Sequence, residues 1–492
     1  MNGRNPDGLY TEVPHFFLQG HPLSHLSTMA VSFAYSTFRG ASVDGVHVAR
    51  LTLPAPPTDD DSAALPVLVH FHGGFWKTDW GMHNIPSDEL HAAFGDGGDV
   101  ASWDVEYARV DQAEPATSLA GGGWPHTCLD ALAALNALAE LPHDTRSRLD
   151  LRRVYLCGHS AGGYLALWLA CLSRLLPAER ERIASSVTAI AGAEAGAAAR
   201  GGVVSSLTVC GVVGLAPVTS LVACAAAGLS DFHDAAINFL WRLGPSASTA
   251  LATQHLGAAC PLSLWCTLAA DPNAPAADAR APTAPVNAAA TPVSTPAPPL
   301  RILLVHGLAD TDVPPSLSLS MAAAVWSHSS PPPLWLQLLP EADHYAVVGL
   351  SGALAAGERD AVLASLGQPA MAGEPASSAL AAKPWALVAA ALRAFVTHDD
   401  GALSKLTCSD LEQAESLAKQ AALPVCARHT VGAITTADCA FAQWAAAEPD
   451  SATCMARGLR RWLAWVGESP GEATREWLVA RTPNGLGSPS QQ

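Results

Sequence analysis

Residues 153–164 read R-V-Y-L-C-G-H-S-A-G-G-Y, a strand, a tight turn and the start of a helix by their residue pattern. The apolar run Arg153–Cys157 predicts a buried strand, and the apolar spacing of Tyr164–Leu176 predicts a helix. Between them, Gly158-His159-Ser160-Ala161-Gly162 has the form G-x-S-x-G. In a strand–turn–helix setting this motif raises a serine above the end of the strand, and the turn is too tight for side chains at the two flanking glycines.

Outward from this turn, short apolar runs alternate with helical patterns. Near-continuous apolar strands of this kind are typical of a mostly parallel sheet covered by helices on both faces, an α/β fold. The expected strands are 46–53, 65–71, 103–107, 211–217, 301–306 and 334–339, and the further expected helices are 126–141 and 384–396.

Composition shifts divide the chain into three parts. We expect an N-terminal segment at 1–43, an α/β domain at 44–399 and a helical C-terminal extension of unassigned role at 400–492. Runs of Ala, Pro and Gly bury little apolar surface, so they predict disordered, low-complexity insertions within the domain. These insertions are expected near 177–208, 267–299 and 352–382.

Charge limits the partners of the chain. The 492 residues carry a formal net charge of −17, which disfavours binding to nucleic-acid phosphate and to anionic lipid.

Residues 1–20 lack the apolar core of a secretory signal, so we expect a cytoplasmic protein. Residues 201–230 carry no charge, but their proline, serines and threonines favour a buried strand over a membrane span. The oligomeric state is left open.

The chain has 11 cysteines and no CxxC pair. Several lie in apolar segments and are expected to be small buried residues. Cys408, Cys426, Cys439 and Cys454 crowd the C-terminal part, where two disulfides are one interpretation. Without a secretory signal, free thiols are the favoured one.

A serine hydroxyl needs a base to act as a nucleophile, and the later strand ends supply candidates. His344 follows the strand at 334–339 and is the expected base, which takes the proton of Ser160. The strand at 301–306 leads into Asp310 and Asp312, either of which can orient that histidine, and we favour Asp310. The chain order Ser, acid, His is the order that sheets of this type use.

His70 and His72 raise the alternative of a metal site, because they alternate along one strand and share a face. Asp79 or His83 would have to complete it, since a metal needs at least a third ligand. A Ser, Asp and His set in the right order favours catalysis without a metal or another cofactor.

Six motifs, in order and in context, resemble the α/β-hydrolase superfamily. Within it, the chain resembles an esterase group with an HGG-[FY]-W loop that includes kynurenine formamidases and carboxylesterases. The matching stretches are His70–Trp76, Val105–Tyr107 with Gly121–Pro125, Gly158–Trp168, Val213–Val218, Val305–Pro314 and Ala342–Tyr345. The resemblance spans about residues 45–400, is interrupted by the three insertions and does not reach 400–492.

The resemblance implies that Ser160, Asp310 and His344 form a catalytic triad. It also implies that the loop at 72–76 supplies part of an oxyanion hole. The backbone N–H of Ala161 is expected to be one donor, and Gly74 or Phe75, beside Gly73, the other. Trp76, Trp124 and His159 are expected to line the substrate pocket, although packing in the core is the competing interpretation for the two tryptophans.

These expectations describe a serine hydrolase that cleaves a small carboxylic ester or amide through an acyl-enzyme. The most specific reading, which rests on the resemblance, is an arylformamidase that releases formate from N-formylkynurenine. A broad carboxylesterase is the alternative, followed by an acylaminopeptidase-like hydrolase. An inactive binding module on the same fold is a further one.

Overall fold

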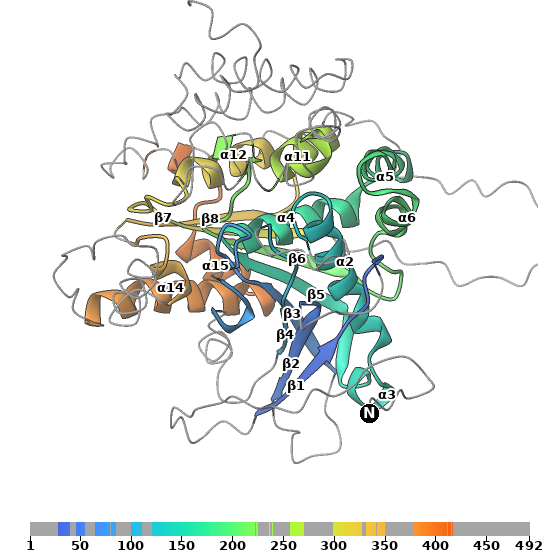
Figure 1. Cartoon of the computed structure of the whole chain (residues 1–492). Coiled ribbons are helices and arrows are strands. Elements are labelled where there is room, and N and C mark those ends of the chain that lie inside the picture. Colours follow the sequence, from blue (N-terminus) through green and yellow to red (C-terminus); the bar gives the residue numbers. More distant parts are fainter. Residues whose placement is uncertain are drawn as a thin grey trace, which may run out of the picture.

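The structure is a computed structural model, shown in Figure 1. Between its N-terminal strand and its last helices it describes most of the chain. The described residues are 28–39, 46–54, 64–78, 80–84, 100–110, 121–221, 223–224, 236, 239, 256–269, 299–326, 331–340, 342–349, 378–410, 412–414 and 416.

A single sheet organises the described residues, with the strand order β1-β2-β4-β3-β5-β6-β7-β8. β1 and β2 are antiparallel to their neighbours, and β4, β3, β5, β6, β7 and β8 run parallel to one another. The strands are β1 (Thr28–Ala34), β2 (Val48–Pro54), β3 (Leu65–Phe71), β4 (Ala101–Val105), β5 (Leu149–His159), β6 (Val209–Leu215), β7 (Arg301–Gly307) and β8 (Leu334–Leu339).

Helices cover both faces of the sheet, and α14 and α15 lie on the face opposite α4, α11 and α12 (Figure 1). The helices are α2 (His126–Ala137), α3 (His143–Arg146), α4 (Ala161–Arg174), α5 (Pro177–Ala191), α6 (Ala193–Gly201), α10 (Leu256–Ala259), α11 (Pro261–Ala269), α12 (Pro315–Trp326), α14 (Ser378–Val396) and α15 (Asp400–Leu406). Short 3-10 turns are η1 (Met82–Asn84), η2 (Leu138–Glu140) and η3 (Ala346–Val348).

Alternation along the strands feeds two separate cores. On β5, Val154 and Leu156 join the core beneath α2, α4 and α12, whereas Tyr155 and Cys157 join the core beneath α14. Every residue of β6, β7 and β8 is buried, as expected for parallel strands covered on two sides. This sheet with helices on both faces is the α/β-hydrolase fold, so the predicted fold class is confirmed.

Two expectations about chain organisation are wrong. The segment 1–43 contains β1, which pairs with β2 and forms the edge of the sheet, so the domain begins before residue 44. The region 177–208, expected to be a disordered insertion, forms α5 and α6, which pack against each other. Alanine is the best helix former, and α5 is capped where the Glu179 carboxylate accepts from the N–H of Leu176 at 3.1 Å.

The boundary at residue 400 also moves. Helix α15 packs against α14, and Cys408 pairs with Leu336 of β8 through two backbone hydrogen bonds. The start of the expected extension therefore belongs to the α/β domain. Residues 417–492, and most of the expected insertions near 267–299 and 352–382, lie outside the described residues.

Seven cysteines are free and buried: Cys128, Cys157, Cys171, Cys210, Cys224, Cys260 and Cys408. Cys426, Cys439 and Cys454 lie outside the described residues. Among the helices that the structure describes, none has the length and apolar character needed to cross a bilayer.

Candidate active site

Ser160 lies in a strained turn between β5 and α4. Its φ of 55° and ψ of −118° put a residue other than glycine in the left-handed half of backbone space. The chain holds this conformation from both sides, because Ser160 N–H donates to Leu215 O at 2.9 Å and its carbonyl accepts from Val218 N–H at 3.2 Å.

The two glycines of the motif are required by close backbone packing. A Cβ on Gly158 would lie 2.2 Å from the carbonyl carbon of Gly162. A Cβ on Gly162 would lie 2.0 Å from the carbonyl oxygen of Phe71, the last residue of β3. The turn at Gly158–Gly162 is therefore packed against the end of β3, where the 72–76 loop begins.

His344 and Asp310 meet at the carboxyl ends of β8 and β7. His344 Nδ1 lies 2.7 Å from Asp310 Oδ2, and both residues are buried. The other oxygen of Asp310 accepts backbone N–H groups of Asp312 and Val313, each at 2.9 Å. These bonds fix the carboxylate, whereas the Asp312 side chain is half-buried and enters only as a nearby charge.

The electrostatics of this pair favour a charged histidine. Burial acts to lower the pKa of His344, but the adjacent Asp310 carboxylate outweighs it, and the pKa of His344 is raised above its ordinary value. Burial likewise opposes ionisation of Asp310, yet His344 and His306 hold the pKa of that carboxyl well below its usual range. Such a pair stabilises an imidazolium that forms during a reaction.

His306, at the end of β7, is a member of the site that the sequence analysis missed. Its Nε2 lies 2.8 Å from Val313 O and 3.2 Å from Asp310 Oδ2, and its Nδ1 lies 2.7 Å from Ser318 Oγ. A carbonyl oxygen only accepts, so Nε2 carries a hydrogen that it donates to Val313 O. His306 thereby holds the loop that carries Asp310. The signal available in the sequence was a histidine at a strand end, four residues before Asp310.

His159 connects the serine turn to the histidine loop. Its Nε2 donates to the carbonyl of His344 at 2.9 Å, and the two imidazole rings lie 4.5 Å apart. Burial and the neighbouring His344 hold the pKa of His159 well below its ordinary value, so it is neutral. Expected in the substrate pocket, it is 6% exposed, and a Cβ on Gly73 of the predicted oxyanion loop would lie 2.9 Å from its Nδ1.

The hydroxyl of Ser160 stands apart from the Asp310–His344 pair. Its oxygen is buried and makes no hydrogen bond to a described residue. The structure thus joins the predicted acid and base, while the predicted nucleophile lies in the adjoining turn without that contact. Catalytic hydrogen bonds are often long or misaligned in the absence of substrate.

The predicted oxyanion loop turns sharply beside Ser160. A Cβ on Gly73 would lie 3.2 Å from the Cβ of Ser160, so the loop backbone approaches the serine directly. Gly74, Phe75 and Trp76 all have positive φ, at 102°, 49° and 59°.

Trp76 and Trp124 are part of the core. Trp76 is fully buried, with its ring 4.3 Å from Phe239 and 5.3 Å from Tyr164, and Trp124 packs edge-on against Trp168. Neither ring presents a surface to solvent, which favours the competing interpretation of packing in the core.

The two histidines of the metal alternative, His70 and His72, lie in different surroundings. Both ring nitrogens of His72 contact protein acceptors, Gly73 O at 2.8 Å and Glu106 Oε1 at 3.0 Å. His70 is buried on β3, where loss of solvent lowers its pKa to about 4. In the part of the chain that the structure describes, no three His, Cys, Asp or Glu residues gather as a metal site would need, and Asp79 lies outside that part.

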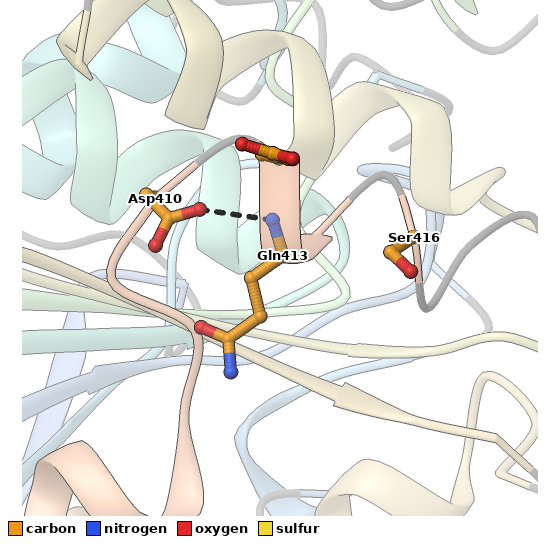
Figure 2. Close-up of a pocket in the computed structure, with 4 residues that line it drawn as sticks. Asp410, Gln413 and Ser416 are labelled. Carbon is orange, nitrogen blue, oxygen red and sulfur yellow. Dashed lines mark hydrogen bonds between the residues drawn. The ribbon is translucent and has the colours of Figure 1, made fainter.

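Figure 2 shows a separate depression near the end of the described chain. It is lined by Asp410, Glu412, Gln413 and Ser416, and Asp410 caps the turn by accepting from Gln413 N–H at 2.9 Å. All four residues are exposed. The histidine and carboxylate that form a buried pair lie elsewhere, at the ends of β8 and β7.

Comparison with known proteins finds a partial sequence similarity to an esterase. No family model matches it. Over 120 residues it is 34% identical to the esterase LipI of Mycobacterium tuberculosis, an alignment that covers 24% of this chain and 33% of LipI. The chain thus spans about a third of the length of this curated relative.

Solved structures of similar shape include two esterases. Esterase B from Lactobacillus rhamnosis matches with 17% identity and a TM-score of 0.41, over 69% of this chain and 86% of that one. An acetyl xylan esterase from Paenibacillus sp. R4 matches with 16% identity and a TM-score of 0.38, over 68% and 82%. The strand order and helix placement of this chain themselves establish an α/β-hydrolase fold.

Proposed function

We propose that the chain is a serine hydrolase that cleaves a carboxylic ester through an acyl-enzyme on Ser160. The observation that carries the proposal is the buried Asp310–His344 hydrogen bond of 2.7 Å, next to a serine in a strained strand–helix turn. In this proposal Ser160, His344 and Asp310 are the triad. The esterase relative is compatible with it, over the third of its length that aligns.

The proposed reaction begins when Ser160 Oγ rotates towards His344 Nε2, the ring nitrogen that Asp310 does not occupy. Oγ attacks the ester carbonyl carbon, and its proton passes to Nε2. The C–O bond to the alcohol then breaks, and the alcohol leaves with that proton. Water attacks the acyl-enzyme by the same route, which releases the carboxylic acid and restores Ser160.

The negative oxygen of the tetrahedral intermediate needs donors on the side away from His344. We propose the N–H of Ala161, at the start of α4, with the N–H of Gly74 or Phe75 from the loop that abuts Ser160. The helix α4 adds its positive N-terminal end at the same place. Gly73 provides the close approach rather than a donor.

A substrate comparison tests this proposal. Purified chain is assayed for kcat/KM with p-nitrophenyl acetate, butyrate and octanoate and with N-formylkynurenine. Turnover of a p-nitrophenyl ester that is lost in Ser160→Ala and kept in Ser173→Ala, a serine later on the same helix, supports a serine esterase. An unchanged rate in Ser160→Ala would contradict it. The formamidase reading rests on resemblance alone, and a rate for N-formylkynurenine below the ester rates by orders of magnitude would exclude it.

A further inference from the structure

His72 and Glu106 form a buried pair next to the predicted oxyanion loop. His72 immediately precedes Gly73, and its side chain is 1% exposed. Its Nε2 lies 3.0 Å from Glu106 Oε1, and Glu106 follows the end of β4. Its Nδ1 lies 2.8 Å from the carbonyl oxygen of Gly73.

The two partners of the ring determine its protonation. A carbonyl oxygen only accepts hydrogen bonds, so Nδ1 carries a hydrogen. Glu106 also receives the N–H of Met82 at 2.8 Å and of Tyr107 at 3.2 Å, and its Oε1 lies 3.1 Å from the Arg109 guanidinium. A carboxyl surrounded by donors is ionised, and an ionised carboxyl only accepts. Nε2 must therefore carry a hydrogen too, which makes His72 an imidazolium.

The pKa of Glu106 agrees with this protonation state. Burial by itself would raise that pKa, but the bonds from His72, Arg109 and Met82 outweigh it and hold the pKa below its ordinary value. The paired charges are also the reason that both groups can be buried here, since a lone buried charge is costly.

We propose that Glu106 holds His72 as an imidazolium, and that this pair is a positioning device that aims the Gly74 N–H at the oxyanion of the reaction. The proposal rests on the proposed function. In a trans peptide the C=O and the N–H point in opposite directions. Because His72 Nδ1–H binds the carbonyl of Gly73, the N–H of the same peptide, which belongs to Gly74, is directed away from His72.

The ring itself is held rigidly. Tyr107 stacks on His72 with ring centres 4.1 Å apart and an angle of 5°, as suits a cationic ring on an aromatic face. The Tyr107 hydroxyl donates to the carbonyl of His72 at 2.7 Å. The fixed positive charge also polarises the Gly73–Gly74 peptide, which makes its N–H a stronger donor. Transition-state stabilisation by fixed dipoles depends on such preorganisation.

The protonation state is tested without turnover, in the Ser160→Ala protein. Histidine is labelled with ¹⁵N, and the His72 signals are identified by their loss in His72→Gln. At neutral pH we expect both His72 nitrogens to resonate as protonated nitrogens. A His72 with one unprotonated nitrogen would overturn the proposal, whether or not the chain proves to be a serine hydrolase.

Kinetics separate charge from shape. In Glu106→Gln the amide can donate to Nε2 of a neutral His72, which keeps the contact to the ring and removes the charge, although the NH2 group no longer accepts the Tyr107 N–H. We expect kcat to fall about 10-fold with KM within 2-fold. In Glu106→Leu both are lost, and kcat should fall by about 10²–10³. Asp104→Asn is the control, because Asp104 is a buried carboxylate on β4, the strand that precedes Glu106, and pairs with Arg50 at 2.9 Å.

The kinetic results decide whether the Glu106–His72 pair positions the loop. A kcat for Glu106→Gln equal to that of Asp104→Asn and of the unmodified chain would refute the positioning role. If Glu106→Leu does not fold, Glu106→Gln and the ¹⁵N spectrum still decide. If the unmodified chain hydrolyses no ester, the proposed function fails, and the spectrum alone then tests the ion pair.

Discussion

Substituting Gly162 with alanine would separate two backbones that the fold presses together. The new Cβ would lie 2.0 Å from Phe71 O, 2.4 Å from His72 O and 2.5 Å from the carbonyl carbon of Phe71. Real Cβ contacts essentially never fall below 3.0 Å, so the end of β3 and the start of α4 must separate by about 1 Å. No flexible side chain is available to absorb this movement, because the contacts are all backbone.

Two losses follow from that displacement. Overpacking of this kind destabilises folding by about 1–3 kcal/mol. The larger effect falls on catalysis, because the displaced β3 end leads directly into the loop whose backbone abuts Ser160. A misplacement of about 1 Å at a reacting centre costs roughly 10²-fold. We therefore expect kcat/KM for p-nitrophenyl acetate to fall about 10²-fold in Gly162→Ala.

The assay pairs esterase kinetics with urea unfolding, so that loss of folded protein is distinguished from loss of rate. Gly201→Ala is the matched control, because a Cβ there meets nothing within 4 Å at the end of α6. It should leave kcat/KM unchanged and leave stability unchanged or raised by up to about 1 kcal/mol. A folded Gly162→Ala protein with a kcat/KM within 2-fold of the parent would refute the proposed contact between the Gly158–Gly162 turn and the 72–76 loop.

Further outcomes concern the acid and the C-terminal helices. Asp310→Asn should lower kcat by about 10⁴, measured under saturating ester, because the ring of His344 loses its orientation and its counter-charge. The base must be neutral to act, so kcat/KM should rise with pH through the raised pKa of His344, and a profile whose midpoint lies at or below the ordinary histidine value would contradict the assignment. Arg301→Met should cost about 1–2 kcal/mol in urea unfolding, because its guanidinium lies 4.7 Å from the Trp335 ring and 2.7 Å from Asp400. Asp400→Asn, whose side chain is 58% exposed, should cost less than about 1 kcal/mol, and the reverse ranking would be inconsistent with the packing.

Strand positions were readable from the sequence where burial on both faces leaves an unbroken apolar run. The expected strand at 65–71 coincides with β3, and the one at 301–306 ends one residue before β7 does. Because parallel strands end at one edge of a sheet, these strand positions also predicted that Asp310 and His344 lie close together. Helix α12 was missed because it is buried nearly all round, so PSLSLSMAAAVW shows no amphipathic period.

Features that depend on contacts between distant segments could not be read in this way. The positive φ of Phe75 and Trp76 is imposed by packing rather than by residue type, since neither residue favours that region. Glu106 lies 34 residues from His72, and no local pattern links a glutamate after one strand to a histidine after another. The role of His306 was missed because its place in an apolar strand is equally typical of an ordinary buried residue.

Covalent labelling tests whether Ser160 is the nucleophile. A fluorophosphonate transfers its phosphonyl group to an activated serine oxygen and expels fluoride, and peptide mass spectrometry locates the adduct. We expect a single adduct on Ser160, absent in Ser160→Ala, present in Ser173→Ala and strongly slowed in Asp310→Asn. Labelling that persists in Ser160→Ala, or an unlabelled but folded parent chain, would contradict the account.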